Sequence, residues 1–128
     1  MRVLLDTHVL LWWIADDPRV SRRAARAIAN PRNDVFVSAV SAWETVTKAS
    51  SGRLRLPGDP RVVFLEQLES NGFSQLPITI RHAIATAALP GIHRDPFDRL
   101  LIAQAIEEDL ALVSGDDVLG RYPVRVLW

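Results

Sequence analysis

The chain has 128 residues and a mass of 14.3 kDa, which suits one domain with a substantial hydrophobic core. Its 15 basic and 15 acidic side chains cancel, and this balance argues against non-specific binding to polyanions. The absence of cysteine excludes disulfides, thiolate metal ligands and a cysteine nucleophile. No apolar run approaches the ~20 residues that span a bilayer, and the N-terminus lacks a signal-peptide pattern. We therefore expect a soluble, cytoplasmic protein without a membrane segment, with one domain over residues 1–128.

Charge is unevenly distributed along the chain. Residues 1–64 carry ten basic and six acidic side chains, whereas residues 65–128 carry five basic and nine acidic ones. Chance scatter on a solvated surface would produce this difference, and so would an acidic centre with a basic border. Only Lys48 is a lysine, so a phosphate-binding loop that ends in Gly-Lys is absent.

Strand and helix signals alternate along the chain. Strands are predicted where short apolar runs are bounded by turn residues, at residues 2–6, 35–37, 73–78, 111–113 and 124–127. Helices are predicted where a capping residue, such as Ser21, Asp59 or Thr79, precedes periodic apolar positions. They cover residues 8–15, 22–29, 41–50, 60–71, 79–89 and 96–109, with Thr7 as the cap of the first and a short turn or helix after Asp116.

This alternation predicts an α/β fold with a mostly parallel central sheet of about five strands, flanked by helices. Ligands bind to such sheets beyond the carboxyl ends of the strands. Asp6 and Asp116 each follow a predicted strand, one near each end of the chain. Both positions are also suited to helix caps, so the pattern by itself leaves their role open.

Asp98 is the acidic residue that helix geometry singles out. At about 100° per residue, it projects between Ile102 and Ala105 on the buried side of its helix. A carboxylate there is costly unless it is paired or bound to a metal, which favours a functional role. Asp95 lies in the same turn and competes with it.

Glu44 gives the opposite indication. The expected packing stripe of its helix consists of Ala42, Trp43, Val46 and Ala49. Glu44 points away from this stripe, and an i,i+4 pair with Lys48 explains it as a surface residue. None of the three histidines has a metal-ligand spacing, although His93 is close in sequence to Asp98.

Five segments together resemble the PIN-domain family, and within it the VapC-type toxins of bacterial and archaeal toxin–antitoxin pairs. They follow the family's order from residue 4 to the end of the chain. The segments are Leu4–Trp12, Ser38–Thr45, His93–Ala105, Leu112–Asp116 and Val126–Trp128. The resemblance implies a single PIN-like domain.

The resemblance also implies a set of site residues. Its catalytic and metal-binding acids correspond to Asp6, Glu44, Asp98 and Asp116, and the side chains that line the site to Thr7, Ser114 and Arg99. The family's Ser-x-Asp pattern selects Asp116 over Asp117, and an acid followed by Arg-Leu-Leu selects Asp98 over Asp95. For Glu44 the resemblance overrules the surface interpretation, because the face turned from the packing stripe can border a cleft.

Clustered carboxylates repel one another unless a cation neutralises them, and a purely oxygen ligand set suits Mg²⁺ or Mn²⁺. The resemblance implies a metal-dependent endoribonuclease that hydrolyses structured RNA with a metal-activated water, leaving a 5′-phosphate and a 3′-hydroxyl. It further implies a VapB-type antitoxin as partner and a homodimer. The alternative is a catalytically inactive PIN-like module that binds RNA or protein.

Two other surfaces are candidates for contacts. Arg99 and the group Arg22, Arg23 and Arg26 are candidates for phosphate contacts, with solvated surface as the simpler explanation for the group. Trp12 and Trp13 diverge by about 100° on a helix and cannot both face one core. We therefore expect one of them in an exposed apolar patch that a partner covers.

Overall fold

Five short strands form one parallel sheet in the order β3-β2-β1-β4-β5. The computed structural model describes residues 1–128. The strands are β1 (Arg2–Leu5), β2 (Asp34–Ser38), β3 (Ser74–Leu76), β4 (Ala111–Val113) and β5 (Val126–Leu127). Every neighbouring pair is parallel, so the predicted α/β class is confirmed and the sheet is parallel throughout.

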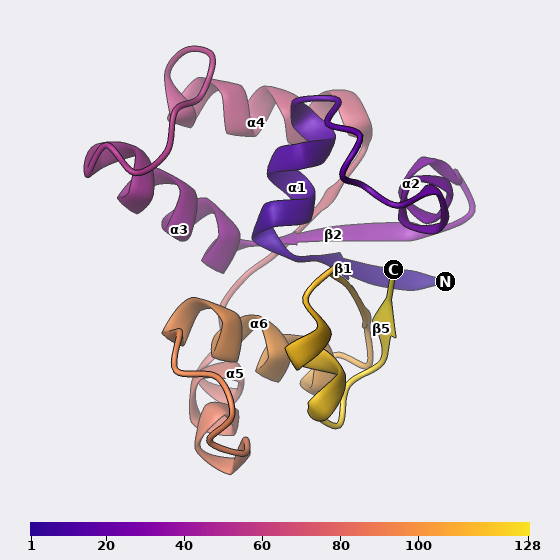
Figure 1. The fold of residues 1–128 in the computed structure, drawn as a ribbon, viewed down its shortest axis with the longest axis vertical. Helices are drawn as coiled ribbons and strands as arrows, with labels where there is room; N and C mark the ends of the chain where they lie inside the picture. The colour runs from indigo at the N-terminus through magenta and orange to yellow at the C-terminus, as the bar shows by residue number, and fades with distance from the viewer.

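Helices cover both faces of this sheet (Figure 1). They are α1 (Thr7–Ile14), α2 (Arg22–Ala29), α3 (Ala39–Ser50), α4 (Pro60–Asn71), α5 (Ile80–Ala85) and α6 (Pro96–Glu107), with 3₁₀ turns η1 (Thr86–Ala88) and η2 (Asp117–Arg121). No helix is long and apolar enough to cross a membrane. Each predicted helix is present, and the predicted helix over 79–89 divides into α5 and η1.

The core consists of two layers, one on each face of the sheet. Val3 and Leu5 of β1 pack into a cluster that includes side chains of α1, α2 and α4. Leu4 points the other way, into a cluster built largely from α6. Side chains alternate across a strand, so a continuous apolar run is the pattern expected for a strand buried on both faces.

Local sequence signals explain most helix ends. Asp59 accepts a hydrogen bond from the Arg61 amide at 3.0 Å, and Gly72 ends α4 in the left-handed region with φ of 67°. Thr79 caps α5. The predicted cap of α1 is wrong, because Asp6 takes the N-cap position and Thr7 is the first helical residue. The Asp6 carboxylate makes no capping hydrogen bond, because it accepts a hydrogen bond from Ser114 instead.

The expected exposed patch at Trp12 and Trp13 is also wrong. Trp13 packs against the core and donates its indole N–H to Asn71 Oδ1 at 3.0 Å. Trp12 packs against the terminal Trp128, with ring centroids 6.2 Å apart, and the guanidinium of Arg19 lies over its ring. Both indoles are half-buried by side chains from distant segments, which a helical projection cannot reveal. The exposed large apolar side chains are instead Met1, Trp43, Val62, Leu65, Ile78, Ile80 and Ile84.

Candidate active site

The register of the sheet places residues from near the two ends of the chain side by side, just beyond the carboxyl ends of β1 and β4. Leu5 of β1 pairs with Val113 of β4, so Asp6 and Ser114 are neighbours just beyond these strands. The Ser114 hydroxyl donates to Asp6 Oδ2 at 2.7 Å and accepts from the Asp116 amide at 3.1 Å. One buried hydroxyl therefore orients the carboxylate of Asp6 and the backbone of Asp116.

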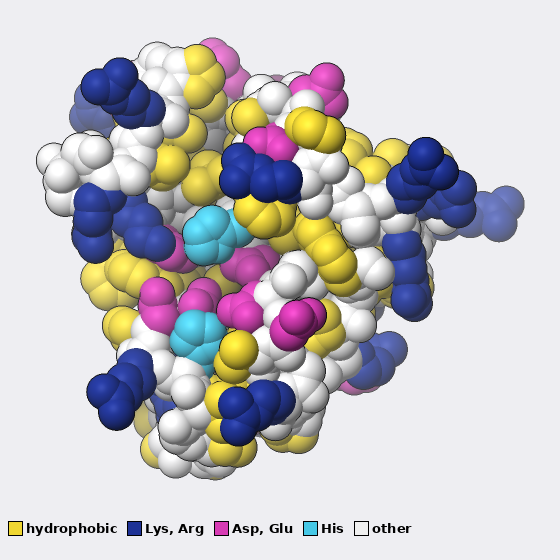
Figure 2. All heavy atoms as spheres, viewed as in Figure 1, with side chains coloured by type: hydrophobic (Ala, Val, Ile, Leu, Met, Phe, Trp, Pro, Cys, Tyr) yellow, Lys and Arg dark blue, Asp and Glu magenta, His cyan; other side chains and the backbone are white.

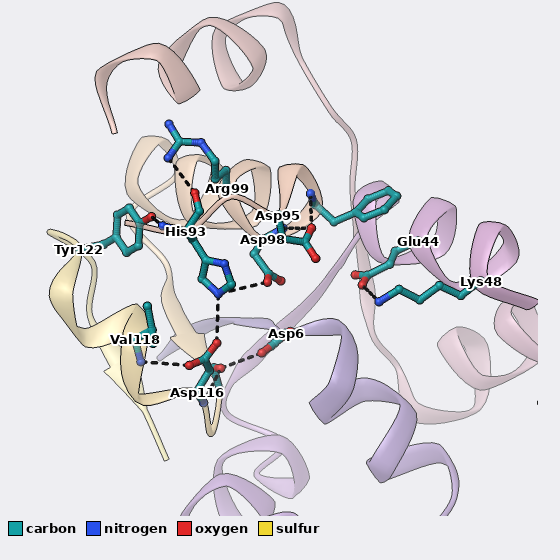
Figure 3. A network of polar contacts seen from close by, with 12 residues as sticks. Asp6, Glu44, Lys48, His93, Asp95, Asp98, Arg99, Asp116, Val118 and Tyr122 are labelled. Atoms are coloured by element: carbon teal, nitrogen blue, oxygen red, sulfur yellow. Dashed lines mark hydrogen bonds and ion pairs between the residues drawn. The ribbon is translucent and has the colours of Figure 1, made fainter. Parts of the chain in front are cut away.

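The first turn of α6 supplies the next carboxylate. Asp95 caps this helix by accepting from the amides of Phe97 and Asp98, at 2.8 and 3.4 Å. Asp98 is then free to point toward Asp6 and Asp116 (Figure 3). Its side chain is only 17% exposed, as helix periodicity predicts. Asp95 therefore caps the helix, whereas Asp98 directs its carboxylate toward the other acids.

Glu44 completes the group, and the surface interpretation of this residue is wrong. Helix α3 buries Val40, Ser41, Glu44 and Thr45, whereas Trp43 from the expected packing stripe is 57% exposed. Glu44 is 1% exposed because its polar face packs beside α1 and α6. The predicted pair with Lys48 is present, with Lys48 Nζ 2.5 Å from Glu44 Oε2. We call Asp6, Glu44, Asp98 and Asp116 the acid cluster.

His93 lies between two members of the acid cluster. Its Nε2 is 3.2 Å from Asp116 Oδ2 and 3.4 Å from Asp98 Oδ2. Its backbone N–H donates to the Tyr122 hydroxyl at 2.6 Å, which holds the segment in place. Sequence spacing alone indicated only that His93 is near Asp98.

Burial and repulsion between acids raise the pKa values of two members of the acid cluster, Asp98 and Asp6. The pKa of Asp98 is raised to about 6, first by burial and then by the negative charges of Asp6, Asp95 and Glu44, against the opposing effect of His93. Burial also raises the pKa of Asp6, against the hydrogen bond from Ser114. The cluster is therefore short of positive charge.

Two carboxylate oxygens of the cluster have no partner. Asp6 Oδ1 and Glu44 Oε1 are buried and accept no hydrogen bond, and they are the only such side-chain atoms in the chain. A buried, unpartnered carboxylate oxygen is costly, and a hard divalent cation would satisfy it. These residues fit such a cation. In the present arrangement, however, no three acidic or histidine side chains are placed to hold one ion together.

Comparison with known proteins identifies the family of this chain. The sequence matches the PIN domain family over residues 3–124. The chain belongs to the PIN-domain family. It is 37% identical over 115 residues to Ribonuclease VapC22 of Mycobacterium tuberculosis, covering 89% of this chain and 86% of that relative. This identity places the PIN domain described here among the VapC-type members.

Solved structures share the fold of this PIN domain. VapBC2 of Rickettsia felis, bound to a promoter DNA fragment, superposes with a TM-score of 0.75 at 15% identity, over 98% of this chain and 97% of that one. DNA-bound VapBC of Salmonella typhimurium gives a TM-score of 0.71 at 19% identity, over 98% and 96% of the two chains. Likeness at such low identity establishes the fold.

The residues expected to line the site of the PIN domain divide into two groups. The Thr7 hydroxyl contacts that of Ser41 at 2.9 Å beside the acid cluster, and Ser114 binds Asp6 directly. Arg99, expected to contact phosphate, bonds backbone carbonyls in this structure. Its guanidinium donates to the carbonyls of Thr86, Leu89, Pro90 and His93 at 2.8 to 3.4 Å, so it stabilises the segment before α6.

The surface of the PIN domain shows where the acidic and basic side chains of the unevenly charged sequence lie. Figure 2 shows Asp and Glu side chains in a central hollow, beside histidine side chains and with Lys and Arg around it. An acidic centre with a basic border is therefore present. The group Arg22, Arg23 and Arg26 is not part of this border, because α2 lies toward the start of β1 and β2, away from the carboxyl ends of the strands (Figure 1).

The raised pKa of Asp98 predicts how the metal-free PIN domain responds to pH. The pKa rises from 3.8 to about 6, so the folded state keeps a proton that the unfolded chain releases between these values. The free energy of unfolding contributed by Asp98 therefore falls as pH rises, by less than the ~3 kcal/mol that this pKa difference would give without solvent screening. In EDTA, Asp98→Asn should stabilise the protein at about pH 7.5 and hardly at about pH 4, as measured by urea unfolding. A gain that is equal at both pH values would contradict this assignment.

Proposed function

We propose that this protein is a metal-dependent endoribonuclease that hydrolyses phosphodiester bonds of structured RNA, and that it is the toxin of a toxin–antitoxin pair. The observation that supports the chemistry best is the pair of buried, unpartnered oxygens, Asp6 Oδ1 and Glu44 Oε1, in one acid cluster. The 37% identity to a protein named Ribonuclease VapC22 supports RNA as the substrate.

The acid cluster would hold Mg²⁺ or Mn²⁺ through its carboxylate oxygens. Such an ion, when bound, polarises the phosphodiester and lowers the pKa of an attacking water. Ser114 keeps Asp6 Oδ2 occupied and so leaves Oδ1 free for a ligand. His93 Nε2 lies within 3.4 Å of the carboxylates of both Asp98 and Asp116 and restrains them. Asp95 stays at the cap of α6 and Arg99 anchors the segment before it, so Asp98 is presented by a fixed helix start.

The partner in this proposal is a VapB-type antitoxin. Solved structures with the same fold include VapBC complexes, among them the two from Rickettsia felis and Salmonella typhimurium. The acid cluster would accept a basic side chain of the antitoxin, which would then compete with the metal. Trp43 is exposed and contacts Phe97 edge-on at 4.9 Å, so it offers an apolar contact for the partner. The proposal also includes a homodimer and a cytoplasmic location.

The function is tested by incubating the purified protein with cellular RNA in Mg²⁺ or in EDTA and mapping the new 5′ ends. We expect discrete cleavage sites with 5′-phosphates in Mg²⁺ and none in EDTA. Binding of RNA without cleavage in either condition would instead support a catalytically inactive module. Cleavage that persists in EDTA would rule out the metal-dependent mechanism.

A further inference from the structure

Lys48 is an internal cation at the edge of the acid cluster. Its ammonium lies 2.5 Å from Glu44 Oε2, and the two residues are one turn apart on α3. Their exposure is unequal, because the Glu44 side chain is 2% exposed and the Lys48 side chain 27%. The carboxylate is therefore fixed inside the protein. The ammonium, on a flexible four-carbon stem, is the member of the pair that can move.

A pocket of about 280 Å³ adjoins this ion pair, between α1 and the end of α3. Its lining residues are Thr7, His8, Leu11, Glu44, Thr45, Lys48, Arg53 and Leu54. Arg53 is exposed, forms no ion pair, and donates its Nε–H to Ser51 Oγ at 2.9 Å. Apart from Glu44 at its inner side, the charged side chains of this pocket are cationic. It is thus suited to an anion.

The same Glu44 carboxylate is claimed by two cations. A divalent ion bound by the acid cluster would use the free Oε1 of Glu44, neutralise the carboxylate and repel the ammonium of Lys48, which would then leave Oε2. The displaced ammonium would then lie in a pocket whose other strong charge, Arg53, is also positive. Two cationic side chains that line one pocket favour an anionic ligand there. An RNA chain supplies such a ligand, because each nucleotide brings one phosphate next to the scissile one.

We propose that the pocket between α1 and α3 is a subsite for a backbone phosphate of the RNA, contacted by Arg53 and by Lys48. Lys48 becomes available to this subsite only when a divalent cation binds Glu44 and so breaks the Glu44–Lys48 pair. This inference rests on the proposed function. It makes substrate binding conditional on metal binding, since the metal-free protein keeps Lys48 on Glu44.

The exchange is tested first by titrating Mn²⁺ alone in a calorimeter. Lys48→Gln should bind Mn²⁺ about tenfold more tightly than wild type, because the ion no longer competes with the ammonium. Arg53→Gln is the matched control, since it removes one charge from the same pocket without touching Glu44, and it should stay within about twofold. Equal affinity of Lys48→Gln and wild type would overturn the exchange. If the wild type binds no Mn²⁺, or if Asp98→Asn binds it equally well, the proposed function itself fails.

The phosphate subsite is tested by fluorescence anisotropy with a labelled oligothymidylate of about twelve nucleotides, whose backbone carries the same charges as RNA. At saturating Mn²⁺, each of Lys48→Gln and Arg53→Gln should weaken binding about three- to tenfold. In EDTA, only Arg53→Gln should do so. If Lys48→Gln weakens binding equally in both conditions, Lys48 is a simple surface cation and the exchange is wrong. If neither variant changes the affinity, the pocket is not a phosphate subsite.

Discussion

Asp98→Asn should reduce metal-dependent RNA cleavage at least about a hundredfold, which corresponds to about 2.7 kcal/mol of activation free energy. The carboxylate of Asp98 points into the acid cluster from the first turn of α6, where burial and three neighbouring acids raise its pKa. An amide has the same size, yet it cannot supply the negative charge that a divalent cation needs. The initial rate on an RNA substrate in Mg²⁺, at several protein concentrations, measures the effect.

Asp95→Asn is the matched control for this substitution. Asp95 lies in the same turn and carries the same charge, but its carboxylate caps α6. Asparagine caps a helix about as well as aspartate, so this variant should keep its rate within about threefold of wild type. Loss of activity in both variants would show that the helix start, and not the carboxylate of Asp98, is what cleavage requires. A normal rate for Asp98→Asn would remove this residue from the site.

Glu44→Gln should cause a loss of similar size, about a hundredfold or more in the cleavage rate. Glu44 is fully buried, and its Oε1 is one of the two oxygens without any partner. Glutamine replaces one carboxylate oxygen by an amide nitrogen, which is not a ligand for Mg²⁺, and removes the charge that attracts the ion. The Mn²⁺ affinity should fall together with the rate, which separates loss of the ligand from a purely structural effect.

Glu66→Gln serves as the control for Glu44→Gln. Glu66 is exposed on α4 and belongs to no ion pair, so the same change of charge there should leave both cleavage rate and Mn²⁺ affinity unaltered. Circular dichroism of the Glu44→Gln protein should match that of wild type, since Lys48 can turn its ammonium toward solvent. If Glu44→Gln retained more than about a tenth of the wild-type rate, Glu44 would not be a ligand.

Much of the fold follows from signals that act within a few residues. The Asp59-Pro60 start and the Gly72 end of α4 are correct because caps depend on local backbone geometry. The buried strands are correct because an unbroken apolar run has to be covered on both faces. Helix periodicity correctly predicts the buried position of Asp98 for a related reason, since a helix fixes the direction of each side chain relative to its neighbours.

Other parts of the site depend on residues that are distant in the sequence. That Asp6 and Ser114 are neighbours follows from the pairing of β1 with β4, which no local signal specifies. The sequence makes Arg99 a candidate for phosphate contact, but four carbonyls of the preceding segment accept hydrogen bonds from its guanidinium. Local pattern likewise indicates an exposed indole on α1, and contacts from Asn71 and Trp128 leave both indoles half-buried.

Glu44 shows most clearly what only the tertiary structure decided. The sequence by itself determined that α3 is a helix and that Glu44 and Lys48 lie one turn apart on it. It did not determine which face of α3 is buried, and the apolar stripe indicated the wrong one. The free energy of burying a helix face depends on what that face contacts. Here α1 and α6 meet the polar side of α3, and Lys48 partly neutralises the buried carboxylate, so the polar face is inside and Trp43 is outside.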